Sequence, residues 1–371
     1  MPALPDNPLA RLRRGHVDQI VGHLTRSGPC SRAELARATG LSRTTLSTVA
    51  AGLLESGMVR EIDAAPRAER GRPSLMLALD PVVPVAIGVD IAHRRTRVTI
   101  AGAGRRILAT ATQAARARTP WADRVGAAVA LLEATLAEHR LPTRALEGIG
   151  IGVVGPVDDK RAEVTRTEFG RRFPVPILVD NNTRLAGLAE TTLGAATDAQ
   201  VLYVRLSNGV GGAAVVGGEL IHGASGAAAE IGHLCIDPDG PPCWCGGAGC
   251  LETYISVPAL LARCRPHGIR SVAALRRSAA EPVTQLLRDV GTTLGIALAH
   301  AATILNPSRI IVGGELGTPA LLRAAETEMR RRTMPTTHRD LTVDPAALSD
   351  EDGALGGICL VLTNPRPKAV P

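Results

Sequence analysis

Apolar positions follow two different periods along the chain, and the change falls near residue 80. Before it the spacing is that of short amphipathic helices. Beyond it short apolar runs alternate with Gly-rich turns and with helical segments such as Val125–His139. Five runs are predicted to be buried strands of an α/β arrangement: Val85–Asp90, Ile149–Val154, Val175–Val179, Val201–Leu206 and Arg309–Val312. The pattern predicts two unlike domains, residues 1–80 and 81–371.

A weak internal repeat runs through the second part. Val85–Thr110 and Val201–His222 each have the pattern of strand, turn, strand, turn, strand. Two such halves suggest a two-lobed fold with a cleft between the lobes.

The first part is predicted to hold three helices. The first buries one face, because four apolar residues recur at the i, i+3, i+4, i+7 interval: Val17, Ile20, Val21 and Leu24. The second begins at a capping box made by Ser31 and Glu34 and stops at Gly40. The third begins at Ser42 and ends before Gly57. Two short helices joined by a tight Gly turn, after a supporting helix, form a helix-turn-helix.

A two-stranded wing is predicted next, from Met58–Ile62 and Leu75–Leu79, with the basic segment Arg67–Pro73 between them. The start of the second helix of the pair enters the major groove in this geometry, and Arg residues on a stiff loop suit the minor groove. The candidate DNA-binding residues are Ser42, Arg43, Thr44, Thr45, Ser47, Arg70, Gly71 and Arg72. The alternatives are an ordinary solvated helix face and a plain basic linker.

Charge supports the DNA interpretation. The net charge is +7, and Leu9–Arg72 alone carries eleven Arg against six acidic residues. This local excess indicates an anionic partner. The alternative cause of the Arg-rich, Lys-poor usage is coding bias. Hydrophobic residues make up 45% of the chain, which excludes a disordered class. The sequence lacks both an apolar run of about 18 residues and a signal core, so we expect a soluble cytoplasmic protein without membrane contact.

Three of the seven cysteines fall within eight residues. With one preceding histidine they offer the four donors of a closed, tetrahedral, structural zinc site: His233, Cys243, Cys245 and Cys250. The alternative is a Gly-rich loop of unmetallated thiols. Glu230 and Glu252 flank the motif and are candidate ligand-binding carboxylates. The other four cysteines are expected to be core residues: Cys30, Cys235, Cys264 and Cys359.

These motifs resemble those of the ROK family (repressors, open reading frames and sugar kinases), and specifically its winged-helix regulators, over essentially the whole chain. The matching segments are Glu230–His233, Cys243–Glu252, Gly155–Asp158, Ile311–Gly314 and Gly353–Gly356. The resemblance implies an actin-like, ribonuclease-H-like two-lobed domain of the sugar kinase type. It further implies structural Zn²⁺ on the four donors and a sugar effector bound by Asn181, Glu230, His233 and Glu252.

Departures from the kinase pattern argue against catalysis. Family kinases carry Asp-x-Gly-Gly-Thr in the first phosphate loop, where this chain has side chains in place of both glycines at Asp90–Arg94. The second loop, Gly-Thr-Gly-x-Gly in kinases, is altered at Ser207–Gly211. Asn182 occupies the position of the general base, and an amide cannot accept a proton from a sugar hydroxyl. We therefore expect no enzyme activity and no catalytic residues.

The segment after Asp158 is shorter than in the family and lacks the Asn and Gly-Trp that close over the sugar. The ligand is then larger than a hexose or of another kind, or the domain is a scaffold without an effector. The favoured interpretation is a sequence-specific, DNA-binding transcriptional repressor that senses a sugar-like effector and forms a homodimer or homotetramer on a double-stranded operator. The alternatives are a ligand-independent DNA-binding or scaffold protein and an active ATP-dependent sugar kinase.

Overall fold

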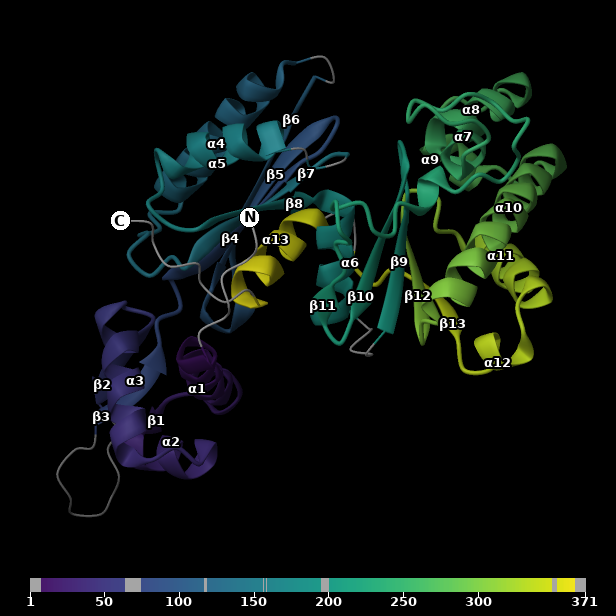
Figure 1. The fold of residues 1–371 in the computed structure, drawn as a ribbon. Coiled ribbons are helices and arrows are strands. Elements are labelled where there is room, and N and C mark those ends of the chain that lie inside the picture. Colours follow the sequence, from purple (N-terminus) through teal and green to yellow (C-terminus); the bar gives the residue numbers. More distant parts are fainter. Residues whose placement is uncertain are drawn as a thin grey trace. The chain divides into compact units, whose positions relative to one another are not determined.

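The computed structural model describes residues 8–63, 75–116, 119–155, 157, 159–194, 200–348 and 352–363. The chain forms two compact units (Figure 1). One comprises Met1–Ile151, Asp159–Val179 and Leu360–Pro371, and the other Gly152–Asp158 and Asp180–Cys359. Among the described residues, no helix is both long and apolar enough to cross a bilayer.

The N-terminal part of the first unit is a winged helix-turn-helix. Its elements are α1 (Pro8–Ser27), β1 (Cys30–Ser31), α2 (Arg32–Thr39), α3 (Arg43–Glu55), β2 (Val59–Asp63) and β3 (Leu75–Leu79). The strands form an antiparallel sheet in the order β1-β3-β2. The three helices pack around a common apolar core that includes Ile20, Leu24, Leu35, Leu46, Val49, Leu53 and Leu77. The predicted helices and wing strands are confirmed.

Local signals set the ends of these helices. Ser31 and Glu34 form the predicted capping box: the Ser31 hydroxyl accepts from the Glu34 N–H at 3.3 Å, and a Glu34 carboxylate oxygen accepts from the Ser31 N–H at 2.9 Å. Gly40 ends α2 at a φ of +70°, a left-handed conformation that residues with a Cβ rarely adopt. The Ser42 hydroxyl caps α3 by accepting from the Thr45 N–H at 3.1 Å.

The rest of the first unit is built on a five-stranded sheet. Its strands are β4 (Pro84–Ile91), β5 (Arg95–Gly102), β6 (Ile107–Ala114), β7 (Gly148–Val153) and β8 (Ile177–Asn181), in the order β6-β5-β4-β7-β8. Its helical elements are η1 (Ala103–Arg105), α4 (Trp121–Glu138) and α5 (Asp159–Gly170). Strand β8 begins two residues later than the predicted Val175–Val179, because Pro176 has no N–H to donate and precedes the strand.

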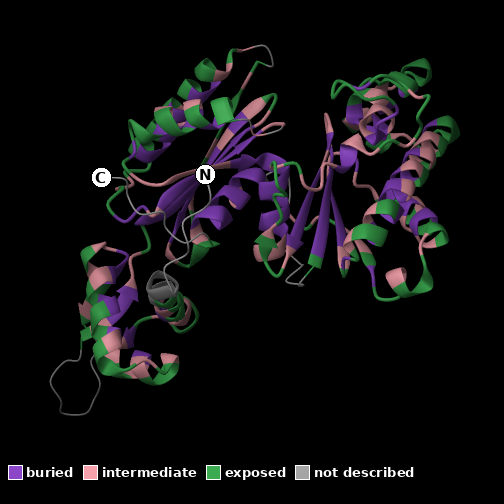
Figure 2. Ribbon diagram, in the orientation of Figure 1, coloured by how far each residue is buried: buried purple, intermediate pink, exposed green. Residues whose placement is uncertain are grey.

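The second unit contains a sheet with the same strand order. Its strands are β9 (Gln200–Leu206), β10 (Val210–Val216), β11 (Glu219–Leu220), β12 (Arg309–Gly314) and β13 (Thr342–Pro345), in the order β11-β10-β9-β12-β13. In both sheets the first three strands form a meander, and the fourth and fifth follow beyond the first. The internal repeat predicted from sequence is therefore confirmed. The three central strands of this sheet, β10, β9 and β12, are buried along most of their length, whereas the edge strands β11 and β13 are partly exposed (Figure 2).

Helices cover the second sheet and the loop that carries the cysteine motif. They are α6 (Asn182–Thr192), η2 (Ile231–His233), α7 (Leu251–Ile255), α8 (Val257–Cys264), η3 (Arg265–His267), α9 (Val272–Arg277), α10 (Glu281–Leu305), α11 (Pro319–Arg332) and α12 (Pro335–His338). The last helix is α13 (Asp352–Thr363). A continuous core joins β9 and β12 to α10 and α11 through Leu202, Val204, Val312, Leu294, Leu298 and Leu321.

Candidate metal centre and effector site

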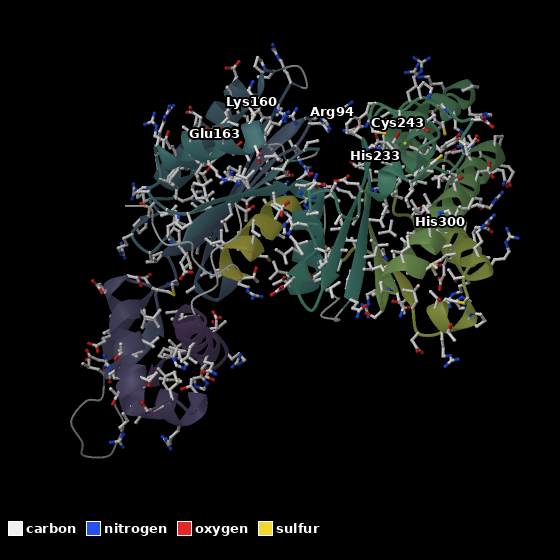
Figure 3. All side chains as sticks on the ribbon, in the orientation of Figure 1. Arg94, Lys160, Glu163, His233, Cys243 and His300 are labelled. Atoms are coloured by element: carbon white, nitrogen blue, oxygen red, sulfur yellow. The ribbon has the colours of Figure 1, made fainter. Side chains whose placement is uncertain are left out.

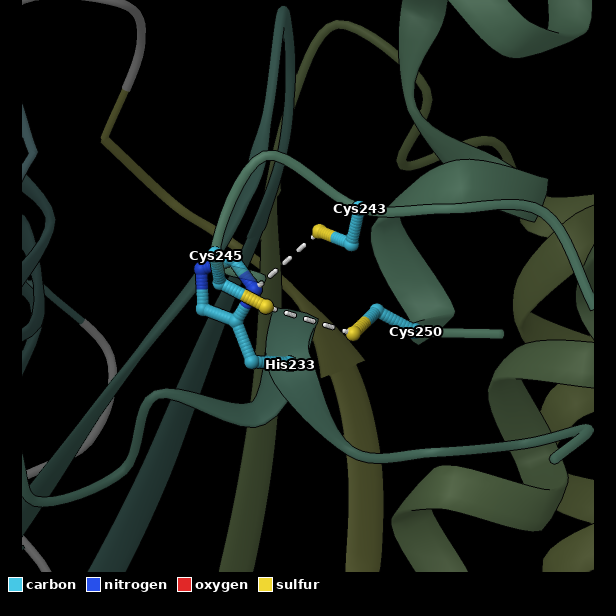
Figure 4. Close-up of side chains that lie close together, drawn as sticks. All are labelled: His233, Cys243, Cys245 and Cys250. Carbon is cyan, nitrogen blue, oxygen red and sulfur yellow. Dashed lines mark hydrogen bonds between the residues drawn. The ribbon is translucent and has the colours of Figure 1, made fainter. Parts of the chain in front are cut away.

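The structure brings the predicted histidine and cysteine ligands together. His233 closes η2, Cys243 and Cys245 lie on the following loop, and Cys250 precedes α7. One ligand atom from each of the four residues lies within 4.8 Å of all the others. The His233 Nδ1 is 3.6 Å from the Cys243 Sγ, and the Cys245 Sγ is 3.6 Å from the Cys250 Sγ (Figure 4). The cluster can hold a metal ion.

These separations fit a tetrahedral ion. Zn–S bonds of about 2.3 Å place two sulfur ligands about 3.8 Å apart at tetrahedral angles, and the shorter Zn–N bond brings nitrogen slightly closer. The loop is held by its own backbone, because the Cys243 N–H donates to the Gly247 carbonyl at 2.8 Å. Gly249 has a φ of +60°, and a Cβ there would overlap the Asp237 carbonyl oxygen at 1.5 Å. A glycine is therefore required between the second and third cysteines.

The thiols also influence one another's ionisation. Burial raises the pKa of Cys250 to about 12, and the neighbouring Cys245 and Cys243 add to this. A hydrogen bond from the Gly247 N–H lowers the pKa of Cys245, which lies on the exposed side. Several thiolates in one place are unfavourable unless a cation compensates them, which is the condition that a metal ion satisfies.

Cys235 differs from the sequence prediction. Cys30, Cys264 and Cys359 are buried as expected, but Cys235 is exposed. Its neighbours Leu234 and Ile236 pack against the core of the second unit, and in an extended segment the residue between them points to the other side.

Glu252 is oriented by two hydrogen bonds on the edge of the cysteine loop. Its Oε2 accepts from the Val210 N–H at 2.9 Å, and its Oε1 accepts from the Trp244 indole N–H at 2.6 Å. Trp244 also meets the His233 ring edge to face at 4.9 Å, while its side chain remains 67% exposed. Sequence reasoning missed Trp244, although its place between two ligand cysteines was a visible signal.

Glu230 lies close to the other predicted effector residues. Burial raises the pKa of Glu230, the nearby Glu252 adds to this, and Arg184 and His233 act in the opposite direction. Glu252 and His233, which also belongs to the cysteine cluster, therefore lie close enough to Glu230 to act on it electrostatically.

Asn181 is engaged in the local structure. Its Oδ1 accepts from the Thr183 N–H at 2.7 Å and the Arg184 N–H at 3.2 Å, which caps α6. Its Nδ2 donates to the Gly155 carbonyl at 2.8 Å. An amide has two N–H groups, and within the described part of the chain one of them donates, so the other is left for a ligand.

A buried ion-pair network, missed from sequence, joins α6 to the loop that carries Glu230. Asp180 Oδ1 accepts from Arg184 Nε at 2.7 Å, and Asp180 Oδ2 lies 2.7 Å from His222 Nε2. Arg184 donates to the Gly226 carbonyl at 2.7 Å and lies 3.9 Å from Glu230. The i, i+4 spacing of Asp180 and Arg184 was the available signal. His222 could not have been assigned, since 42 residues separate it from Asp180.

The segments compared with kinase phosphate loops both lie at hairpin turns. His93 and Arg94 are exposed between β4 and β5. At the β9–β10 turn the Ser207 N–H donates to the Gly209 carbonyl at 2.9 Å. Asn182 is buried as the first residue of α6. The shortened segment after Asp158 folds as helix α5.

The predicted DNA-contacting residues occupy the start of α3. Ser42, Arg43, Thr44 and Ser47 are exposed, whereas Thr45 is partly buried beside the cap. Leu46 and Val49 of the same helix face the core. The polar face is thus free of core contacts. Arg70, Gly71 and Arg72 lie outside the described residues.

Comparison with known proteins places the chain in a family. The ROK family model matches residues 86–364, and the MarR family model matches residues 19–70. The chain is 24% identical to the DNA-binding transcriptional repressor Mlc of Escherichia coli, covering 95% of this chain and 96% of that protein. It is also 24% identical to the xylose repressor of Bacillus subtilis, covering 92% and 94%.

Solved structures agree in fold. A ROK family transcriptional regulator, homologous to E. coli Mlc, superposes with a TM-score of 0.75 at 21% identity, over 94% of this chain and 96% of that one. A ROK glucokinase from Streptomyces griseus, in complex with glucose and AMPPNP, gives 0.63 at 28% identity, over 74% and 98%. The predicted winged helix and sugar-kinase-type fold are confirmed. The chain therefore belongs to the ROK family, and a MarR-type winged helix precedes its ROK domain.

Proposed function

We propose that this protein is a sequence-specific, DNA-binding transcriptional repressor whose ROK domain senses a sugar or sugar-like effector. The observation that carries the proposal is the joining of two sites in one chain. In the winged helix, the first turn of α3 is polar and exposed. In the ROK domain, the carboxylates of Glu230 and Glu252 lie close to the cysteine cluster. Relatives matched over more than nine-tenths of the chain bear the names of repressors.

On the DNA side, α3 is the recognition helix. Its first turn offers Arg43 and small hydroxyl side chains, while its apolar face is fixed in the core. Arg43 suits a guanine edge, since its guanidinium donates two parallel hydrogen bonds to O6 and N7. Two-fold oligomers read two-fold sites, so we propose a homodimer or homotetramer on a near-palindromic operator.

Selection of bound fragments from a double-stranded genomic library tests this function. The full-length protein is used at about 0.15 M salt, where non-specific phosphate binding is weakened. We expect enrichment of a near-palindrome, which an added sugar depletes. Absence of any enriched sequence, with and without sugars, would overturn the proposal.

Replacing Arg43 by Ala is expected to weaken operator binding by about 1–3 kcal/mol and to relax the preference at one base pair. Titration of the selected operator and its single-base variants measures both effects. The matched control is Arg277→Ala, which removes the same charge from an exposed position in the other unit. Equal weakening on every sequence would place Arg43 on a phosphate instead.

On the effector side, we propose that Glu230, His233, Glu252 and the remaining N–H of Asn181 bind sugar hydroxyls. Carboxylates accept two hydrogen bonds from neighbouring hydroxyls, and the His233 ring nitrogen that does not face the cysteines adds one N–H donor. The cysteine loop would hold structural Zn²⁺ on His233, Cys243, Cys245 and Cys250 and thereby fix Glu252. A bound ion with four protein ligands supplies rigidity rather than an activated water.

Replacing Glu252 by Gln is expected to weaken sugar binding about 10- to 100-fold, because a charged acceptor becomes a neutral one. Glucose, xylose and N-acetylglucosamine are the probes, since relatives and solved neighbours are named for them. Calorimetry gives the affinity, and Glu219→Gln, at an exposed strand end, is the control. Operator binding without sugar should be unchanged; its loss would mean that Glu252 is structural.

Kinase activity is proposed to be lost, because Asn182 occupies the general-base position and side chains fill the first phosphate loop. Loss of a general base costs on the order of 10²–10⁴ in rate. Sugar-dependent ATP turnover by the purified protein would contradict this and favour the kinase alternative.

A further inference from the structure

Two N–H donors at the start of α4 are buried without an acceptor in the described part of the chain. They are the indole Nε1 of Trp121 and the guanidinium Nε of Arg124. Arg124 is 9% exposed, so it is a nearly buried cation and not a surface side chain. Buried donors in folded proteins nearly always have a partner, and an orphaned pair points to a missing ligand.

Two guanidinium groups flank the same indole ring. The Cζ atoms of Arg124 and Arg161 each lie 5.5 Å from the ring centroid of Trp121. Burial lowers the pKa of Arg124, the charge of Arg161 lowers it further, and the buried Asp90 acts in the opposite direction. Two guanidinium groups and one carboxylate, that of Asp90, therefore share a region from which solvent is partly excluded.

The N-terminal end of α4 also favours an anion. This 18-residue helix begins after Pro120, whose side chain makes no capping hydrogen bond, and Asp123 is the acidic residue of its first turn. The positive end of the helix dipole lies there. Arg124 Nη2 donates to the Ala92 carbonyl of the β4–β5 turn, which holds the guanidinium in place. Arg94 on that turn and Lys160 on α5 project from the same unit (Figure 3).

We propose that Trp121, Arg124, Arg161 and the N-terminus of α4 form a binding site for a phosphate group. The three side chains of the proposed site are donors, and guanidinium and helix N–H groups are the usual partners of phosphate oxygens. Asp90 and Asp123 are the carboxylates that oppose an anion there. Arg161 is exposed and gives the site its face toward solvent. The site shares no residue with the proposed effector group, which lies in the other unit. If phosphate does not bind at this site, the proposed function is unaffected.

Calorimetric titration of the full-length protein with inorganic phosphate, at matched ionic strength, tests the site. We expect one phosphate per chain. Arg161→Gln should weaken binding about tenfold or more, because a charge-assisted contact is removed from an exposed position. Arg166→Gln removes the same charge from the same exposed helix and should leave the affinity unchanged. Trp121→Phe replaces the indole by a smaller aromatic ring without an N–H and should weaken binding severalfold.

Tryptophan fluorescence shows independently whether phosphate binds next to Trp121. The chain has two tryptophans, so in a Trp244→Phe background Trp121 is the single indole and its emission should change on titration with phosphate. Glucose 6-phosphate and glucose distinguish the source of the group. Tighter, Arg161-dependent binding of the ester than of phosphate identifies a phosphorylated ligand, and equal affinities identify the free ion. Absence of binding up to about 10 mM phosphate, or equal losses in Arg161→Gln and Arg166→Gln, would overturn the proposal.

Discussion

Replacing Cys250 by Ser is expected to abolish metal binding and to destabilise the cysteine loop by several kcal/mol. Cys250 is 3% exposed and supplies one of the four converging ligand atoms. Its loss leaves three donors for a structural ion, and structural zinc contributes about 10–16 kcal/mol of apparent binding energy in zinc-finger peptides. Elemental analysis of the purified variant and its thermal unfolding measure both effects. The loop carries Trp244 and leads into Glu252, so the sugar response should be lost with the metal.

The control for this experiment is Cys235→Ser. Cys235 is exposed, lies near His233 in sequence and is not part of the cluster. The Cys235→Ser variant should retain one metal ion per chain and wild-type stability. Unchanged metal content in Cys250→Ser, or an equal loss in both variants, would contradict the assignment of the four ligands.

Replacing Asp180 by Ala is expected to cost about 3–5 kcal/mol of unfolding free energy. The change leaves the Arg184 guanidinium, whose side chain is 3% exposed, without the carboxylate that it contacts at 2.7 Å. A buried charge without a partner is far more costly than a lost surface ion pair. Urea-induced unfolding measures the effect. His222→Gln is the milder comparison, because its ring is half exposed and glutamine can still donate to Asp180. A cost below about 0.5 kcal/mol for Asp180→Ala would show that the network is not stabilising.

The same network predicts a pH dependence with a definite sign. Burial would raise the pKa of Asp180, but its bonds to His222 and Arg184 outweigh this, so the pKa is below the ordinary 3.8. Its stabilising contribution is present above 3.8 and is lost as pH falls through the lowered value. The hydrogen bond to Asp180 raises the pKa of His222 above 6.5. That contribution is full below 6.5 and is lost as pH rises through the raised value. The stability difference between wild type and Asp180→Ala should therefore peak between these limits.

Much of the fold could be predicted because its signals are local. The capping box at Ser31, the glycine at position 40 and the cap at Ser42 act within one helical turn, so the helix-turn-helix is written in consecutive residues. The repeated strand pattern reflects side-chain alternation along single strands, which again needs no distant partner. The prediction was less accurate for β8, which begins two residues later than predicted because Pro176 precedes it.

The candidate site was predictable only in part. The ligand spacing from Cys243 to Cys250 specifies a compact loop, and it brought His233 into reach as expected. Asn181 shows the other case: the family resemblance implied that it binds the effector, but its side-chain oxygen caps α6. The Asn181 oxygen accepts from the first N–H groups of α6, because these groups have no partner within the helix and lie next to it in sequence.

By itself the sequence determined the family, the winged helix, the doubled strand pattern and the composition of the cysteine cluster. Each of these depends on residues within a few positions of one another or on a fixed motif. Only the tertiary structure decided that Asp180 meets His222 and that Trp244 orients Glu252. It also decided that Arg124 and Arg161 flank one indole. Contacts between side chains on separate elements depend on how those elements pack, and their energies are set by the burial that packing creates.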